Sequence, residues 1–256
     1  MIYSSTSRFS CNDWARNFYP AGMTKLEWLT YYARESNTRE VNSTFCALAR
    51  PFSLATTVEK TGEGFRSSIK VNKEMIHQQE DKAGIYEYLC QVLEPIVTAV
   101  KLSCILTPFT CRFGFNFRNW NYLGLSGEWL GAPPLVIEFR NVQWQRSEVF
   151  DWLHRQDLGF YCVDESQLSN LLPPLVESTS KISYVRFHGR NRAKWWQHKQ
   201  VYERHDYSYT SEELSEWLPK IQKLVGSIAG NTFIFANNHW CGQAVNTIRK
   251  LRIMLN

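Results

Sequence analysis

Charged and amide side chains follow a series of short apolar runs in this chain of 256 residues. Carboxylates, cations and a histidine stand where such runs end, and these groups transfer protons and bind anions. The set consists of Glu40, Asn42, Lys70, Glu138, Arg140, Asp164, Arg186, His188 and Asn237. Their recurrence predicts one polar site that is assembled from distant parts of the sequence.

The apolar runs themselves have the length and composition of β-strands. They cover residues 2–5, 38–42, 65–71, 102–107, 135–140, 160–164, 182–188 and 232–237. Helix-compatible stretches separate most of them, whereas residues 110–134 predict a loop and an irregular helix. Strands alternating with helices predict a TIM-type (β/α)8 barrel, here one domain over residues 1–256. In that fold the C-terminal strand ends line the active site.

The two-residue period of a strand sorts the side chains by face. Within 182–188, Arg186 and His188 share one face, and Val185 and Phe187 share the other. The runs 38–42, 65–71 and 135–140 alternate in the same way. Because a lone buried charge is costly, charges of both signs are expected to point inward and to pair. They form either a pocket at the barrel mouth or an internal ion-pair network without chemistry.

Residue type suggests a role for each member of the set. Three carboxylates are acid or base candidates: Glu40, Glu138 and Asp164. Three cations would hold an anion or stabilise developing negative charge: Lys70, Arg140 and Arg186. His188 could transfer protons near neutral pH. Asn42 is a further substrate-binding candidate. The amides of Asn237 and Asn238 would either orient a substrate or cap the following helix.

The segment 186–205 interleaves basic residues with Trp195 and Trp196. Loops after the seventh and eighth strands of such barrels often bind phosphate, which adds Arg190 and Asn191 to the substrate-binding candidates. Basic residues among aromatic ones also bind single-stranded nucleic acid. The alternative is a solvated loop whose tryptophans cover the barrel mouth.

A metal site is a further hypothesis. Glu40, Glu138, Asp164 and His188 stand on four different strands and could ligate one divalent ion. Neither an H-E-x-x-H motif nor a similar local spacing supports this, and three cations would compete for the same carboxylates. We therefore do not favour a metal, and the cofactor remains unknown. The chain also lacks a G-x-G-x-x-G motif and a P-loop, which argues against dinucleotide and nucleoside triphosphate sites of those types.

Composition sets broad limits. A net charge of +5 and a pI of about 8.8 permit an anionic partner without requiring one. Apolar runs stay far below the roughly 18 residues that span a membrane, so no membrane association is expected. Seven cysteines without a C-x-x-C pair, and no recognisable signal peptide, lead us to expect a cytoplasmic protein without a disulfide framework.

Several of these segments also form motifs in a fixed order. They read Asp13-Trp14, Glu40-Val-Asn42-Ser-Thr-Phe45, Ile69-Lys70-Val71, Glu138-Phe-Arg140, Tyr184-Val-Arg186-Phe-His188-Gly-Arg190-Asn191 and Asn237-Asn238. With them the chain resembles the domain-of-unknown-function-72 (YecE-like) family from about residue 3 to residue 251. The resemblance implies a TIM-type barrel and carries no established activity.

The chain departs from the family pattern around the expected barrel mouth. Ser5 to Phe9, with Arg8 among them, replace a glycine-rich segment. Residues 106–109 replace a longer proline-containing segment. Cys46 stands where a tyrosine is usual, and His239 stands where an acidic residue is usual. These departures bear on whether the chain handles the same ligand as typical members.

Three functional hypotheses remain open. The leading one is an enzyme that acts on a small anionic, phosphorylated or carboxylated, sugar-like substrate by acid–base chemistry, with hydrolysis, isomerisation and lyase chemistry not distinguished. The second is a nucleic-acid-associated protein that uses the basic and aromatic loop 186–205. The third is a ligand-binding or scaffold barrel without catalysis.

Overall fold

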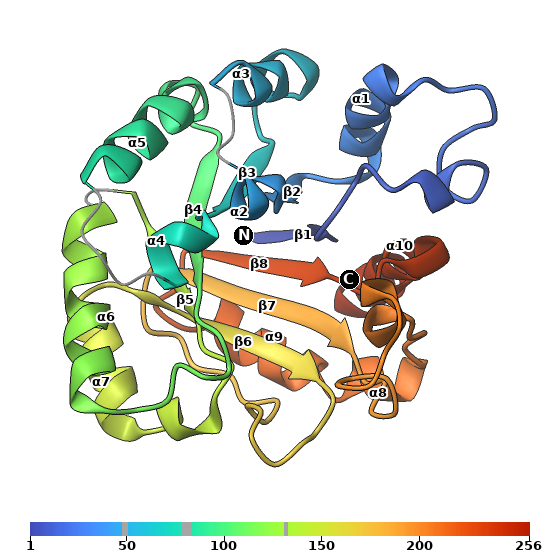
Figure 1. Cartoon of the computed structure of the whole chain (residues 1–256). Coiled ribbons are helices and arrows are strands. Elements are labelled where there is room, and N and C mark those ends of the chain that lie inside the picture. Colours follow the sequence, from blue (N-terminus) through green and yellow to red (C-terminus); the bar gives the residue numbers. More distant parts are fainter. Residues whose placement is uncertain (48–50, 78–82, 131–132) are drawn as a thin grey trace.

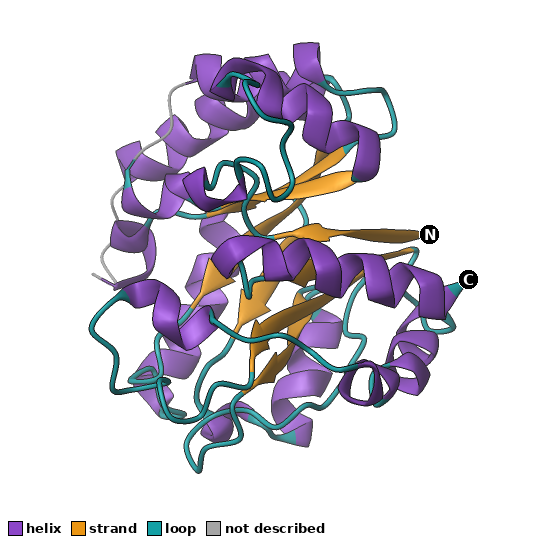
Figure 2. Cartoon of the chain, turned by 90° about the vertical axis from the view of Figure 1, so that its right-hand side faces the viewer, coloured by secondary structure: helices purple, strands orange, loops and turns teal. Residues whose placement is uncertain are grey.

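Eight parallel strands enclose a common interior, with helices outside them, in the computed structural model (Figure 1, Figure 2). The structure describes residues 1–47, 51–77, 83–130 and 133–256. The strands are β1 (Ile2–Thr6), β2 (Thr38–Val41), β3 (Arg66–Lys70), β4 (Leu102–Pro108), β5 (Leu135–Glu138), β6 (Gly159–Glu165), β7 (Ile182–Gly189) and β8 (Asn231–Ala236). All eight expected strands are present within a few residues of their expected bounds, and the predicted TIM-type barrel is confirmed.

The helices follow strands in the chain and lie around the barrel (Figure 1). They are α1 (Lys25–Glu35), α2 (Ser43–Cys46), α3 (Pro51–Lys60), α4 (Lys73–His77), α5 (Ala83–Thr98), α6 (Phe117–Leu130), α7 (Ser147–Arg155), α8 (Ser211–Ser215), α9 (Leu218–Val225) and α10 (Gln243–Leu255). No helix lies between β6 and β7, because the segment 166–181, which is described throughout, is an extended connection with adjacent prolines.

The hydrogen-bonded strand order runs β1-β8-β7-β6-β5-β4-β3-β2. At the seam between β1 and β2, amide side chains replace the missing ladder. Asn37 Oδ1 accepts from the Ser4 amide at 3.1 Å, and Asn37 Nδ2 donates to the Ile2 carbonyl at 3.2 Å. At the other end Asn42 Nδ2 donates to the Ser7 carbonyl at 2.6 Å. Side-chain hydrogen bonds therefore connect β1 and β2 at both ends of the seam. The bond between Asn42 and Ser7 belongs to the candidate site.

Stacked aromatic rings fill the interior deeper than the C-terminal strand ends. Tyr3 stacks on Phe233 at 4.8 Å between ring centroids, and Tyr184 stacks on Phe235 at 5.1 Å and on Tyr161 at 5.5 Å. These rings come from strands whose alternate residues point inward. They exclude water from the barrel and form a rigid floor for the polar side chains that follow them along β6 and β7.

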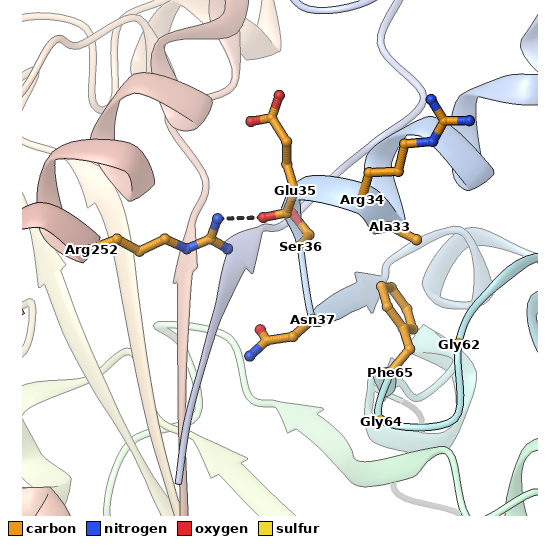
Figure 3. A pocket seen from close by; sticks show the side chains of 9 residues that line it. All are labelled: Ala33, Arg34, Glu35, Ser36, Asn37, Gly62, Gly64, Phe65 and Arg252. Carbon is orange, nitrogen blue, oxygen red and sulfur yellow. Dashed lines mark hydrogen bonds between the residues drawn. The ribbon is translucent and has the colours of Figure 1, made fainter. Parts of the chain in front are cut away.

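A pocket of about 370 Å³ opens at the opposite, N-terminal face (Figure 3). It lies where α1 ends, beside Phe65 just before β3, and Arg252 of α10 donates a hydrogen bond to the Glu35 carbonyl there. In this fold that face serves stability rather than catalysis.

A search of the described residues for membrane-spanning helices finds none of sufficient length and hydropathy.

Candidate functional site

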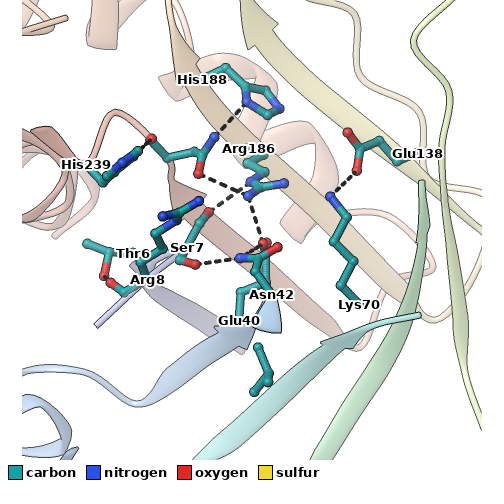
Figure 4. Close-up of polar contacts among 12 residues, drawn as sticks. Thr6, Ser7, Arg8, Glu40, Asn42, Lys70, Glu138, Arg186, His188 and His239 are labelled. Atoms are coloured by element: carbon teal, nitrogen blue, oxygen red, sulfur yellow. Dashed lines mark hydrogen bonds and ion pairs between the residues drawn. The ribbon is translucent and has the colours of Figure 1, made fainter. Parts of the chain in front are cut away.

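A cavity of about 220 Å³ lies at the C-terminal ends of the strands. Its walls are Arg8, Asn42, Phe45, Cys46, Lys70, Arg140, Glu165, Arg186, His188, Trp195, Arg204, His205 and Asn237. Among the described residues, five cationic side chains and one carboxylate line it. Six of the residues predicted from strand ends and their neighbours line it: Asn42, Lys70, Arg140, Arg186, His188 and Asn237. Figure 4 shows four of them, Asn42, Lys70, Arg186 and His188, converging from different strands.

Glu40 and Arg186 form the deepest charged contact of the site. Arg186 Nη2 lies 2.8 Å from Glu40 Oε1, and both side chains are almost fully buried. Glu40 also accepts from Asn42 Nδ2 at 2.7 Å and from the Tyr184 hydroxyl at 2.6 Å. Burial alone would lower the pKa of Arg186, but Glu40 and its neighbours raise it above the usual range. The guanidinium is therefore permanently charged and fixed in place.

A ring of hydrogen bonds connects Arg186 to His188, closed by Arg186 Nη1, which donates to the Tyr161 hydroxyl at 3.4 Å. Arg186 Nη2 donates to Asn237 Oδ1 at 3.1 Å, which turns Asn237 Nδ2 toward His188 Nδ1 at 3.0 Å. His188 Nδ1 must then accept, so Nε2 carries the proton and donates to the Tyr161 hydroxyl at 2.9 Å. Burial, followed by the charge of Arg186, lowers the pKa of His188 well below its usual range. Both ring nitrogens are occupied, which suits a neutral, positioned imidazole.

Glu138 sits between two cations. Its carboxylate lies 2.5 Å from Arg140 Nη2 and 3.6 Å from Lys70 Nζ. Burial opposes the ionised form, yet Arg140 and Lys70 lower the pKa of Glu138 to about 2. Burial lowers the pKa of Lys70 to about 8, with Glu138 opposing that change. The ammonium group also lies 4.9 Å from the centre of the Phe45 ring.

Glu165 is the carboxylate that lines the cavity, and it is not among the residues predicted from the sequence. Burial raises its pKa to about 8, against the effect of Arg140. Strand alternation was the available signal, because Tyr161, Val163 and Glu165 share a face whereas Asp164 shares the other with Cys162. A register shift between β6 and β7 at Asp164/Glu165 accompanies this strand end.

Asp164 lies on the outer side of β6 and does not line the cavity. Its carboxylate accepts from Arg190 Nη2 at 2.7 Å, from the Tyr209 hydroxyl at 2.6 Å and from Trp217 Nε1 at 2.7 Å. Arg190 also reaches Glu216 at 2.8 Å. The structure thus separates Asp164 and Arg190 from the other predicted residues and gives them a shared structural contact.

Asn191 and Asn238 also lie outside the cavity. Asn191 Nδ2 donates to the carbonyls of Glu203 and Asp206, both at 3.1 Å. Asn238 Nδ2 donates to the Tyr207 carbonyl at 2.8 Å and to Thr247 Oγ1 at 2.9 Å. Both amides hold the loop 190–209 in its fold. Neither of the two roles considered for Asn238, substrate contact and helix capping, describes these bonds.

The loop 190–209 covers the cavity and supplies three of its walls: Trp195, Arg204 and His205. His205 Nδ1 lies 3.2 Å from the His188 carbonyl, and burial lowers its pKa to about 2. Arg204 lies 6.0 Å from the Trp195 ring centre, and its buried Nε has no hydrogen-bond partner. Only the folded loop brings these residues to the site.

The four residues considered as metal ligands do not come together. Arg186 pairs with the carboxylate of Glu40, Arg140 and Lys70 pair with that of Glu138, and Asp164 faces away from His188. In the described part of the chain, no group of three His, Cys, Asp or Glu side chains could hold a metal ion.

Two of the departures from the family pattern lie in the cavity wall. Arg8 adds a cation there, and Cys46 stands beside Phe45. Ser5 instead contacts the Tyr32 hydroxyl, and His239 Nδ1 lies 3.1 Å from the Asn237 carbonyl. Arg8 and Cys46 are thus placed to alter what the cavity accepts.

These features define a TIM-type barrel protein with a cation-rich cavity at the C-terminal ends of its strands. The chain belongs to the family described as protein of unknown function DUF72, whose model matches residues 3–256. The resemblance inferred from the motifs is thereby confirmed.

Comparison with known proteins gives relatives over the full length. The UPF0759 protein YunF of Bacillus subtilis is 24% identical, with 100% of this chain and 95% of YunF covered. A DUF72 family crystal structure from Thermotoga maritima has a TM-score of 0.91 and 29% identity, covering 100% and 99% of the two chains. One from Enterococcus faecalis has a TM-score of 0.88 and 22% identity, covering 100% and 96%.

Proposed function

We propose that this protein is an enzyme that binds a small anionic, sugar-like metabolite, phosphorylated or carboxylated, at the C-terminal face of the barrel. The observation that carries the proposal is the charge of the cavity wall, where five cations face one carboxylate. Arg186 is neutralised by Glu40, and Glu138 neutralises only part of the charge of Lys70 and Arg140. An anion would supply the missing negative charge.

The chemistry follows from which groups can exchange a proton. Glu165 has a pKa of about 8, so it is largely protonated at neutral pH and can act as a general acid. Lys70 also has a pKa of about 8 and lines the same cavity. Glu40 and Glu138 hold cations, and His188 positions Tyr161 and Asn237. We assign proton transfer to Glu165 and anion binding to Lys70, Arg140 and Arg204.

Calorimetric titration with sulfate and with sugar phosphates tests the binding step. Lys70→Met and Arg204→Met should each weaken binding at least tenfold. Lys199→Met is the matched control, because Lys199 is exposed on the same loop and does not line the cavity. Equal binding by all four proteins would refute the assignment. For any compound that is turned over, Glu165→Gln should lower kcat by about 10²–10⁴-fold with little change in binding.

A nucleic-acid role is the second candidate, and it rests on the rim of the loop 190–209. Arg192, Trp196 and Lys199 are exposed there, and Trp196 is 56% exposed. Exposed rings between cations can stack on bases while the cations contact phosphates. Labelled oligonucleotides would then bind with an affinity that falls steeply with salt. Binding of oligonucleotides without binding of small anions would place this function first, and ligand binding without turnover would favour a non-catalytic barrel.

A further inference from the structure

A second cavity of about 260 Å³ adjoins the first. The two share six wall residues: Phe45, Lys70, Arg140, Glu165, Trp195 and Arg204. The second cavity adds the end of β4 and parts of three loops through Pro108, Phe109, Thr110, Cys111, Leu171 and Trp196. The first cavity is therefore walled mainly by charged and polar groups, whereas the second is walled mainly by apolar and aromatic ones.

The apolar wall is preformed. Phe109 stacks on Phe113 at 4.1 Å and on Phe139 at 6.1 Å, and it is 1% exposed. Leu171 and Trp195 are also buried. These side chains are held by packing that does not depend on a ligand, so little ordering would be needed on binding. Preformed, mostly apolar pockets with a few polar groups are the usual form of small-molecule sites.

Cations mark the boundary between the two cavities. Lys70 lies against the Phe45 ring, and Arg204 lies against the Trp195 ring, and all four residues line both cavities. The buried Nε of Arg204 has no partner. A small anion bound at these cations would fill the charged cavity alone and leave the aromatic one occupied only by water.

We propose that the natural ligand joins its anionic group to an apolar, planar group at least the size of a phenyl ring. The anion lies among Lys70, Arg140 and Arg204, as in the proposed function on which this inference rests, and the ring lies against Phe109, Leu171 and Trp196. A dry cavity of about 150 Å³ can hold benzene. The second cavity has the volume and the wall for such a group.

Titration calorimetry with methyl phosphate and phenyl phosphate tests this inference, with acetate and phenylacetate as the carboxylate pair. Each aromatic anion should bind at least tenfold more tightly than its methyl counterpart. Trp196→Ala, which removes a half-exposed wall, and Cys111→Trp, which fills the second cavity, should abolish that difference. Neither variant should weaken the binding of methyl phosphate, because neither residue lines the first cavity.

The outcomes separate the two proposals. If methyl and phenyl phosphates bind with equal affinity, the aromatic subsite is refuted and the anion site stands. If neither binds, the proposed function fails and this inference fails with it. If the gain from the ring survives Cys111→Trp in a variant that melts like the wild type, the ring binds elsewhere and the inference is overturned.

Discussion

Arg190 donates to Asp164 from Nη2 at 2.7 Å, and this contact joins the start of the cavity-covering loop to the outer side of β6. The same carboxylate accepts from the Tyr209 hydroxyl at the end of that loop. Tyr209 also accepts from the amide of Gly189, whose φ of +95° turns the chain into the loop. One buried carboxylate therefore holds both ends of the segment that brings Trp195, Arg204 and His205 to the cavity.

Asp164→Asn should loosen this loop without touching the cavity wall. Removing one charge from a buried pair typically costs about 3–5 kcal/mol, and the partial exposure of Arg190 places the expected loss at about 2–3 kcal/mol. Urea unfolding measures this loss in the free energy of unfolding, and limited proteolysis within 190–209 should become faster. Glu216→Gln is the control, because Glu216 contacts the same guanidinium from an exposed position and should change stability by less than about 1 kcal/mol. Unchanged proteolysis in Asp164→Asn would contradict the anchoring role.

The single variant Glu40→Ala should lose more stability than the double variant Glu40→Ala with Arg186→Met. The single change leaves the buried Arg186 guanidinium without its carboxylate, which is expected to cost about 3–5 kcal/mol of unfolding free energy. Replacing both charges removes the uncompensated cation, so the double variant should recover part of that loss. Denaturant unfolding of the two single variants and the double variant gives the coupling between the residues. Additive losses would show that the pair is not energetically coupled.

Sulfate affinity should fall as the pH rises through about 8. Lys70, with a pKa of about 8, loses its positive charge there, and Glu165, also near 8, gains a negative one. Both changes disfavour an anion, whereas sulfate itself keeps its charge. Calorimetry should show at least a tenfold loss between pH 7 and pH 9. In Lys70→Arg with Glu165→Gln the profile should be flat, and a flat profile in the wild type would contradict these protonation states.

Glu165→Gln should gain stability relative to the wild type as the pH rises. Burial raises the pKa of Glu165 to about 8 in the folded protein, whereas in the unfolded chain its pKa has the ordinary value of 4.5. Between these pH values the folded state retains a proton that the unfolded state releases. The wild type therefore loses up to about 1.4 kcal/mol per pH unit from this group across that window. Thermal unfolding at pH 5 and pH 8 should show the gap between variant and wild type widening with pH. A constant gap would mean that Glu165 ionises normally in the fold.

Local sequence determined the barrel and much of its polar interior. Alternation within β7 is enough to put Arg186 and His188 on one face, because successive side chains of a strand point to opposite sides. The same rule applied to β6 would have selected Glu165 in place of Asp164. Strand composition and spacing thus encode which residues face inward, and parallel strands bring those ends together without further information.

Tertiary structure alone decided how the site is closed and which charges find partners. Arg190 and Arg204 are similar in the sequence, yet Arg190 reaches Asp164 outside the barrel and Arg204 enters the cavity. The path of the loop 190–209 depends on contacts with β6, with Asn238 just after β8 and with α10, all distant in the chain. Protonation depends on burial and on neighbours in space, so the opposite pKa shifts of Glu138 and Glu165 could follow only from the folded arrangement.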